Sequence, residues 1–262
     1  MSKNILSEII AHKYTEVAEA STKVTLHELE KAIADNMPPT RSLRQSLESH
    51  RGGIISEFKR RSPSKDWIRR DARVEDIIPQ YEAAGAAALS ILTDSHYFGG
   101  TLEDVRQARK LTHLPILRKE FVVSEYQILE ARAAGADACL LIAAAIGNRR
   151  CHELAQFAHE VGLEVILEIH SSEELEACSL HVDVIGVNNR NLKTFQTSPA
   201  QSEELFPLLP TGPLPISESG LLQPETALHL QKIGYKGFLI GEAFMTSEQP
   251  GERLKKYIEK LS

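Results

Sequence analysis

Ionisable side chains follow several short apolar runs in this chain, and each run has the composition of a buried strand. Glu57 and Lys59 end the first run, and Lys119 follows the third. Glu168 and Glu218 follow two later runs. A nearby cation keeps a carboxylate ionised, whereas burial or a second carboxylate raises its pKa. If these groups meet, they provide a general acid and a general base near neutral pH. The alternative is a structural network of ion pairs.

The elements that must position these groups are indicated by a regular alternation beyond residue 50. Short β-rich runs predict strands at 54–58, 87–92, 115–118, 138–142, 164–168, 184–187, 214–217 and 237–240. Amphipathic segments between them predict helices at 74–84, 102–110, 125–134, 148–161, 172–177, 203–209 and 224–233. Several of these helices are followed by glycine, which commonly ends a helix in the left-handed conformation.

This alternation of strands and helices predicts parallel strands joined by helical crossovers. Eight such units suit a single closed α/β barrel, the (β/α)8 or TIM barrel, over residues 51–262. An open doubly wound sheet is the alternative, but its usual glycine-rich first turn is missing from this sequence. Residues 1–50 have helical periodicity, with Ile5, Leu6 and Ile9 on one face. They predict a helical extension packed on the barrel.

Polar residues gather at one end of the predicted barrel. Six of the eight candidate strands end in or run into them, at the carboxyl end where barrels of this class place their catalytic groups. Ser219 and Gly220 follow the seventh strand, and Gly241 follows the eighth. The loops after these two strands usually bind phosphate, and small residues let backbone N–H groups approach the anion. The sequence therefore predicts an acid–base site for a phosphorylated small molecule.

The overall composition excludes several other classes of protein. Hydrophobic residues make up 42% of the chain, and the net charge of −6 argues against a general nucleic-acid binder. No apolar run approaches the roughly 20 residues of a membrane helix, and the N-terminus predicts an amphipathic helix instead of a signal peptide. Cys139, Cys151 and Cys178 are too sparse for a disulfide framework, which suits the cytoplasm. No HExxH, CxxC or P-loop motif supports a metal or nucleotide site.

Seven phrases of the sequence, each on a candidate strand or directly after one, match the motifs of a known enzyme family. They are ISEFKRRSPS (55–64), LTD with YFGG (92–94 and 97–100), LRKEF (117–121), LEIH (167–170), IGVNNRNL (185–192), SESG (217–220) and LIGE (239–242). With the AHK phrase (11–13) of the extension, they cover nearly the whole chain. The chain resembles the indole-3-glycerol phosphate synthases, enzymes of tryptophan biosynthesis.

The resemblance implies a lyase reaction that uses no metal or organic cofactor. The substrate is 1-(2-carboxyphenylamino)-1-deoxyribulose 5-phosphate, and the products are indole-3-glycerol phosphate, carbon dioxide and water. A cation makes the C2′ carbonyl electrophilic, the ring carbon attacks it, and the carboxylate leaves as carbon dioxide. A hydroxyl group then leaves as water. These steps need an acid and a base in turn, which agrees with the clustered lysines and glutamates.

The resemblance also implies catalytic roles for six residues. Lys119 is the main general acid in ring closure, and Glu168 is an acid or base in dehydration. Lys59 contacts the substrate and donates a proton in dehydration, although the division of acid roles between the two lysines stays open. Glu57 orients and tunes the lysines. The residues implied to hold the sugar hydroxyls or the intermediate are Asn188 and Glu218.

Ten further residues are implied to bind the substrate at two ends of one site. Those at the phosphate end are Ser62, Ser219, Gly220, Gly241 and, through its backbone, Glu242. Those of an apolar slot for the anthranilate ring are Phe98, Phe121, Pro63 and Leu92. For the two phenylalanines, a place in the hydrophobic core is the alternative. The residue with a supporting role near the site is Arg190.

Two residues depart from the family pattern. Glu120 stands where an aspartate is usual, which places a longer carboxylate beside Lys119, and Ser217 stands where an alanine is usual. We expect a cytoplasmic monomer, with a weak dimer as the alternative, that lacks the isomerase domain fused to some relatives.

Two other functions compete with this interpretation. Another phosphate-binding barrel, such as an isomerase of the tryptophan or histidine pathways, would not need both Lys59 and Lys119. A binding or regulatory protein on an inactive barrel would have lost a catalytic group, and none is missing from this sequence.

Overall fold

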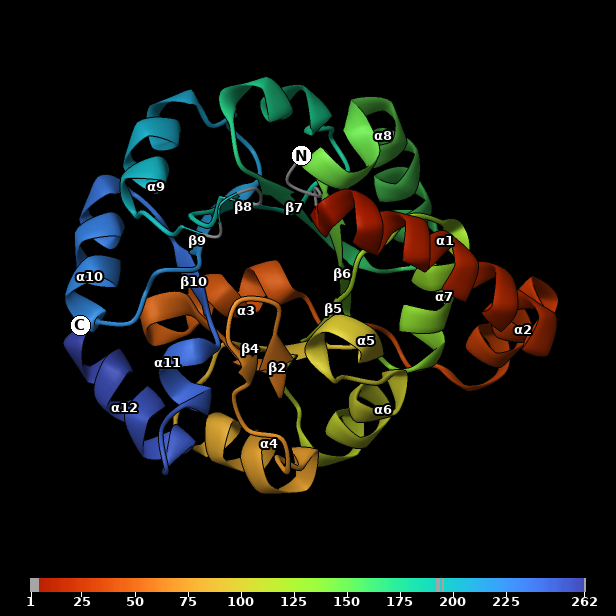
Figure 1. The fold of residues 1–262 in the computed structure, drawn as a ribbon, viewed down its shortest axis with the longest axis horizontal. Coiled ribbons are helices and arrows are strands. Elements are labelled where there is room, and N and C mark those ends of the chain that lie inside the picture. The colour runs from red at the N-terminus through yellow and green to blue at the C-terminus, as the bar shows by residue number, and fades with distance from the viewer. Residues whose placement is uncertain (1–4, 192–193, 195, 262) are drawn as a thin grey trace.

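Eight parallel strands pair into a closed barrel in the computed structural model, which describes residues 5–191, 194 and 196–261 (Figure 1). The strands are β1 (Ile54–Phe58), β4 (Ala88–Leu92), β5 (Ile116–Lys119), β6 (Ala138–Ile142), β7 (Glu164–Ile169), β8 (Val184–Asn188), β9 (Leu214–Glu218) and β10 (Gly237–Ile240). β1 pairs with β4 on one side and with β10 on the other, which closes the ring. The predicted fold class, a (β/α)8 or TIM barrel, is confirmed.

Helices form the outer layer around the barrel (Figure 1). The α-helices of this layer are α4 (Val74–Ala83), α6 (Leu102–Leu111), α7 (Glu125–Ala133), α8 (Ala143–Glu160), α9 (Ala200–Leu205), α10 (Pro224–Ile233) and α12 (Pro250–Lys260). Two short helices, α5 (Ser95–Phe98) and α11 (Glu242–Met245), lie inside this layer, after β4 and β10 (Figure 1). The segment predicted as a helix at 172–177 forms a 3-10 helix, η2 (Ser172–Ala177), as short pieces often do. The helix predicted at 203–209 divides into α9 and η3 (Phe206–Leu208), because Pro207 has no N–H to donate.

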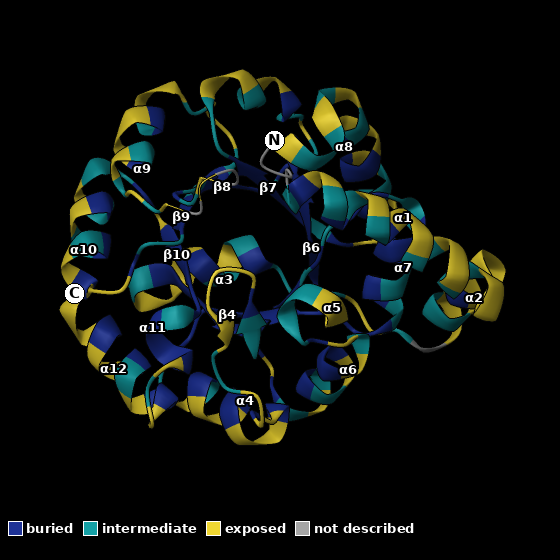
Figure 2. Ribbon diagram, viewed as in Figure 1, coloured by how far each residue is buried: buried dark blue, intermediate teal, exposed yellow. Residues whose placement is uncertain are grey.

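Side chains on the strands belong to two hydrophobic layers. Ile55, Leu117 and Ile166 lie in the interior core of the barrel, whereas Ile54 and Leu89 pack between the strands and the helices. Figure 2 shows barrel strands that are mostly buried and helices that are exposed on their outer faces. Because both faces of each strand are covered, the strand sequences are continuous apolar runs instead of alternating ones.

Three helices precede the barrel: α1 (Ile5–Lys23), α2 (Leu26–Asn36) and α3 (Leu43–Ser49). Thr25 and Glu28 form a capping box that begins α2 just after α1 ends. α1 contacts α7 and α8 (Figure 1). α3 packs Leu43 and Leu47 into the interior core, and Ser46 of α3 donates to the carbonyl oxygen of Ala87, next to the first residue of β4. The short 3-10 helix η1 (Arg51–Gly53) then leads into β1.

The carboxyl ends of the strands are fixed by ladder pairing. The register pairs Leu92 with Lys119 and Asn188 with Glu218. Lys119, Asn188 and Glu218 are the last residues of β5, β8 and β9, each one position beyond the predicted strand end. The backbone of these polar residues is therefore held by the sheet and not by a loop.

The loop after β1 contains a small hairpin that the sequence did not predict. Its strands, β2 (Arg61–Ser62) and β3 (Asp66–Trp67), are antiparallel. Two residues in each strand are too few to produce a periodic pattern. The hairpin gives the loop a fixed shape beside the barrel opening.

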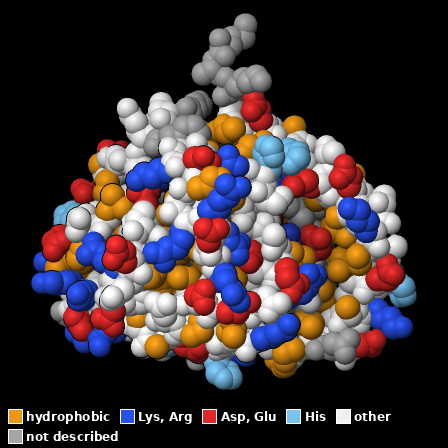
Figure 3. Space-filling view, turned by 60° about the horizontal axis from the view of Figure 1, so that its bottom comes forward, with side chains coloured by type: hydrophobic (Ala, Val, Ile, Leu, Met, Phe, Trp, Pro, Cys, Tyr) orange, Lys and Arg blue, Asp and Glu red, His pale blue; other side chains and the backbone are white. Residues whose placement is uncertain are grey.

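Charges of both signs are intermixed over the face of the molecule in Figure 3, where lysine and arginine side chains lie among aspartates and glutamates. Within the described residues, no helix combines the length and the apolar character that a membrane crossing would require.

Candidate active site at the carboxyl ends of the strands

A cavity of about 370 Å³ lies at the carboxyl ends of the strands. All sixteen site residues named from the sequence line it. They are Glu57, Lys59, Ser62, Pro63, Leu92, Phe98, Lys119, Phe121, Glu168, Asn188, Arg190, Glu218, Ser219, Gly220, Gly241 and Glu242. The fold therefore brings together residues from seven strands and their loops, as the barrel geometry predicted.

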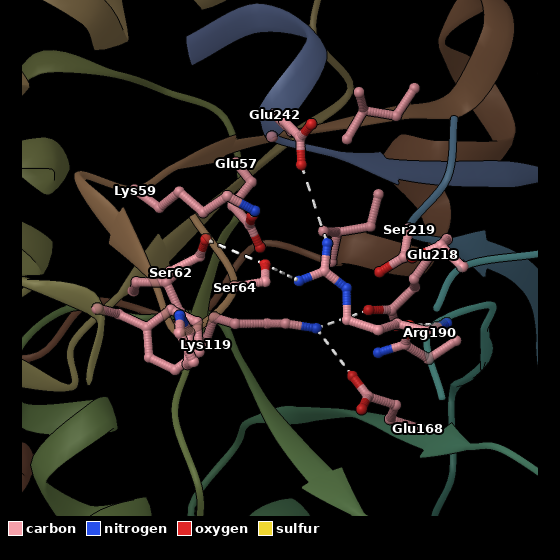
Figure 4. A pocket seen from close by; sticks show the side chains of 18 of the residues that line it. Glu57, Lys59, Ser62, Ser64, Lys119, Glu168, Arg190, Glu218, Ser219 and Glu242 are labelled. Carbon is pink, nitrogen blue, oxygen red and sulfur yellow. Dashed lines mark hydrogen bonds and ion pairs between the residues drawn. The ribbon is translucent and has the colours of Figure 1, made fainter. Parts of the chain in front are cut away.

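The Lys119 ammonium lies between two buried carboxylates (Figure 4). Its Nζ donates to Glu218 Oε2 at 2.6 Å and to Glu168 Oε2 at 3.0 Å. Glu168 is 3% exposed and Glu218 is 1% exposed, so water does not solvate either carboxylate well. The second oxygen of Glu218, Oε1, is buried and has no hydrogen-bond partner among the described residues. This oxygen lies against Gly186 of β8.

Two buried carboxylates that share one ammonium titrate differently. Burial raises the pKa of Glu168, but the charges of Lys119 and His170 outweigh it and hold this pKa well below its usual value. Burial, aided by the charge of Glu168, raises the pKa of Glu218 to about 7 despite Lys119. Burial lowers the pKa of Lys119, but its carboxylate neighbours outweigh this and raise it. The site thus holds an ammonium, a carboxylate and a group that exchanges its proton near neutral pH.

A second ion pair, between Glu57 and Lys59, lies in the same cavity, with 2.6 Å between Lys59 Nζ and Glu57 Oε1. Two motif glycines make room for the carboxylates. A Cβ at Gly241 would lie 2.3 Å from Glu57 Oε1, and a Cβ at Gly186 would lie 2.3 Å from Glu218 Oε1. Any side chain at these positions would displace a carboxylate, which explains why glycine stands at both.

The predicted phosphate end has unusual backbone geometry. Ser219 and Gly220 have φ values of 66° and 72°. This region is strained for serine, and such strain is concentrated at ligand sites. Arg190 crosses the same end, donating from Nη1 to Ser64 Oγ at 3.0 Å, and its Nη2 lies 3.9 Å from Glu242 Oε2 (Figure 4). The loops after β1, β8, β9 and β10 therefore meet at an end that contains a guanidinium group.

The opposite end of the cavity is apolar. The rings of Phe98 and Phe121 lie 6.0 Å apart between centroids, and both line the cavity. Both phenylalanines are half-buried and do not belong to the fully buried core. Three residues of α1 also line the cavity, and the sequence identified them only as a helical face: Ile5, Leu6 and Ile9. Helical periodicity alone does not reveal which surface an apolar face covers.

His170 is a further residue whose place the sequence did not predict, although it belongs to the LEIH phrase. Its Nε2 lies 3.4 Å from Glu168 Oε1, and its Nδ1 lies 3.5 Å from Glu174 Oε2. Burial lowers the pKa of His170, but the hydrogen bond to Glu174 and the charge of Glu168 outweigh it and raise this pKa. His170 therefore supports the ionised state of Glu168.

The two departures from the family pattern have local partners. Glu120 accepts hydrogen bonds from Thr93 Oγ1 at 2.7 Å and from Phe121 N at 2.9 Å. Ser217 Oγ lies 2.9 Å from Asn189 Nδ2 and 2.8 Å from Ser202 Oγ, so its hydroxyl is satisfied inside the protein. Leu192, the last residue of the IGVNNRNL phrase, lies outside the described residues.

Among the residues that the structure describes, no group of three or more histidine, cysteine, aspartate or glutamate side chains is arranged to hold a metal ion.

Comparisons with known proteins decide the family. A profile described as indole-3-glycerol phosphate synthase matches residues 6–257. The chain belongs to the indole-3-glycerol phosphate synthase family. A protein of this name from Bacteroides thetaiotaomicron is 51% identical over 99% of both chains. Another from Chromobacterium violaceum is 42% identical over 97% of both chains. The family predicted from the sequence motifs is confirmed, and with it the function of a carboxy-lyase in tryptophan biosynthesis.

A more distant likeness supports the fold alone. A mutant tryptophan synthase α-subunit from Pyrococcus furiosus superposes with a TM-score of 0.61 at 15% sequence identity, covering 81% of this chain and 98% of that one. At this identity the likeness carries no information on the reaction.

Proposed function

We propose that the residues lining the cavity convert 1-(2-carboxyphenylamino)-1-deoxyribulose 5-phosphate into indole-3-glycerol phosphate, carbon dioxide and water, with the roles given below. One observation carries this proposal: the Lys119 ammonium lies between Glu168 and Glu218, in a cavity with an apolar slot at one end and a guanidinium-bearing end opposite. The substrate has an aromatic ring at one end, which suits the apolar slot, and a phosphate at the other, which suits the guanidinium group.

Ring closure and decarboxylation are assigned to Lys119. The ring carbon that carries the carboxylate attacks the C2′ carbonyl carbon, and the π electron pair of the carbonyl moves to its oxygen. Lys119, held charged by its two carboxylates, donates a proton to that oxygen. The bond to the carboxylate then breaks, its electron pair returns to the ring, and carbon dioxide leaves.

Dehydration is assigned to Lys59 and Glu168. An ammonium protonates the C2′ hydroxyl as the C–O bond breaks, and Lys59 lines the cavity in an ion pair with Glu57. The ionised Glu168 removes the proton from C1′, and the electron pair completes the indole double bond. Glu57 orients Lys59 through their 2.6 Å ion pair. The residues proposed to hold the sugar hydroxyls are Asn188 and Glu218.

Substrate binding is divided between the two ends of the cavity. The residues proposed for the phosphate are Ser62, Ser219, Gly220, Gly241 and the backbone N–H of Glu242, with Arg190 in support. The residues proposed for the ring are Pro63, Leu92, Phe98 and Phe121. We propose that the face of α1 with Ile5, Leu6 and Ile9, which lines the same cavity, also contacts the ring.

The organisation of the chain follows from the same proposal. We assign residues 1–50 to an extension that serves the barrel of residues 51–262, because α1 lines the cavity and α3 packs into the interior core. We also propose a cytoplasmic monomer that needs no cofactor and binds no nucleic acid. Light scattering during size-exclusion chromatography tests the oligomeric state, and a dimer mass would contradict it.

One assay tests the activity directly. Purified protein is mixed with 1-(2-carboxyphenylamino)-1-deoxyribulose 5-phosphate and a chelator, and indole fluorescence is followed. A rate that saturates with substrate and is unaffected by the chelator is expected. Folded protein that produces no signal would contradict the proposed reaction and favour another phosphate-binding barrel.

A further inference from the structure

A second buried ammonium lies outside the catalytic cluster. Lys13 of α1 is 3% exposed, and its Nζ lies 2.6 Å from Asp94 Oδ2 and 3.1 Å from Glu120 Oε1. Asp94 is fully buried, and Glu120 is 4% exposed. Glu16, one turn along α1, is 2.5 Å from the same ammonium at the protein surface. Burying charged groups costs free energy, so a buried cluster of this kind suggests a specific role for Lys13.

Each buried carboxylate also holds the backbone of one cavity phenylalanine. Asp94 Oδ1 accepts from the N–H groups of Tyr97 and Phe98, at 2.5 and 3.3 Å, and so caps the short helix α5. Glu120 Oε1 accepts from the N–H of Phe121 at 2.9 Å. The ammonium of Lys13 is therefore the charge that joins the two loops from which the facing rings project.

The same ammonium fixes the third wall of the apolar slot. Lys13 belongs to α1, whose residues Ile5, Leu6 and Ile9 line the same cavity as the two phenylalanines. One side chain thus links α1, the loop after β4 and the loop after β5. These are the three segments that surround the proposed place of the aromatic ring.

We infer that Lys13 is a positioning residue that sets the width of the apolar slot and thereby the affinity for the substrate's carboxyphenyl group. This inference rests on the proposed function, because it names the group that the slot accepts. Lys13 does not line the cavity, so it acts through Asp94 and Glu120 and not by contact with the substrate. The phosphate end, formed by the loops after β1, β8, β9 and β10, has no direct contact with Lys13 among its ion pairs.

The test compares two methionine substitutions on one helix. Lys13→Met removes the buried charge with little change in volume, and Lys23→Met makes the same change at an exposed position of α1. We measure kcat and KM for both variants and for the parent, together with the inhibition constant of inorganic phosphate. For Lys13→Met we expect KM to rise about tenfold while kcat stays within about threefold and the phosphate inhibition constant within about twofold. Lys23→Met should match the parent.

Three results would overturn the inference. In the first, KM of Lys13→Met stays within about twofold of the parent. In the second, kcat falls and KM does not change, which would place Lys13 in the chemistry. In the third, the phosphate inhibition constant rises as much as KM, which would indicate a general loss of structure.

Two further provisions keep the test decisive. If Lys13→Met does not fold, Glu120→Gln replaces it. Glutamine keeps the oxygen that accepts from Phe121 N but removes the negative charge of the Lys13–Glu120 pair. The expected changes in kcat, KM and the phosphate inhibition constant are then the same. Turnover by the parent tests the proposed function separately. An inactive parent would contradict that function, whereas an active parent with an unaltered Lys13→Met would contradict only the role of Lys13.

Discussion

Two buried lysines have almost the same immediate surroundings and very different prospects for reaction. Lys119 lies between Glu168 and Glu218, and Lys13 lies between Asp94 and Glu120. In both cases two carboxylates compensate one ammonium away from water. The ion pairs alone therefore do not distinguish a catalytic cluster from a structural one.

The remaining carboxylate oxygens make the difference. Around Lys13, Asp94 Oδ1 and Glu120 Oε1 accept from backbone N–H groups, and Thr93 Oγ1 donates to Glu120 Oε2. Around Lys119, Glu218 Oε1 has no partner among the described residues, and Lys119 lines the cavity. Satisfied oxygens hold the backbone in place, whereas the carboxylates of the Lys119 cluster line a cavity and keep one oxygen without a partner in the described part of the chain.

The largest expected effect is that of Lys119→Met. Turnover should fall by about 10³-fold or more, because the proposed general acid is lost, while the circular dichroism spectrum stays that of the parent. The variant should remain folded, since Glu168 and Glu218 can share a proton in place of the ammonium. A kcat within a few-fold of the parent would remove Lys119 from its role and erase the difference between the two lysines.

Glu168→Gln should have the next largest effect. Glutamine keeps the size of the side chain but cannot accept a proton, so kcat should fall by about 10²-fold or more with little change in KM. The assay is again indole fluorescence under saturating substrate. The matched control is Glu16→Gln, which changes the half-buried partner of Lys13 and should leave kcat as it is. An effect on KM alone would make Glu168 a binding residue.

Ser219→Gly should produce a moderate effect at the phosphate end. Glycine adopts the φ of 66° without strain, so the change removes the hydroxyl and leaves the backbone in place. KM and the inhibition constant of inorganic phosphate should both rise about fivefold. For Lys13→Met, by contrast, KM should rise while the phosphate inhibition constant stays nearly unchanged. An unchanged KM would place the phosphate elsewhere.

The smallest effect concerns the pH dependence of stability. Burial raises the pKa of Glu218 from its usual 4.5 to about 7. Between these two pKa values the folded chain keeps a proton that the unfolded chain releases. The contribution of Glu218 to the free energy of unfolding is therefore complete below pH 4.5 and is lost as the pH rises through about 7. Between about pH 6 and about pH 7, Glu218→Gln should lose less free energy of unfolding than the parent, by about 1 kcal/mol. Urea unfolding at both pH values measures this, and equal losses would contradict it.

Much of the fold was predictable because the barrel imposes a simple pattern. Both faces of each strand are covered, so strands such as β6 appear as unbroken apolar runs, and the strand ends differ from the prediction by one residue at most. The hairpin of β2 and β3 was missed because its strands are too short for periodicity. α11 was also missed, because its four residues follow β10 directly.

The candidate site was predictable to the extent that its residues follow strands. Lys119 and Glu218 were found by this rule, and all the predicted residues line one cavity. Lys13 escaped it, because a single lysine in an amphipathic helix normally lies on the solvated face. Only the tertiary structure shows that this side chain turns inward to Asp94 and Glu120.

The closure of the barrel has a consequence for folding kinetics. Glu57 lies near the end of the first strand, and Gly241, which leaves space for its carboxylate, follows the last one. The two meet only when β1 pairs with β10, a contact between segments at opposite ends of the barrel sequence. Such distant contacts form late, because the loop entropy must be lost first. During refolding from urea, helical circular dichroism should therefore return before indole synthesis does.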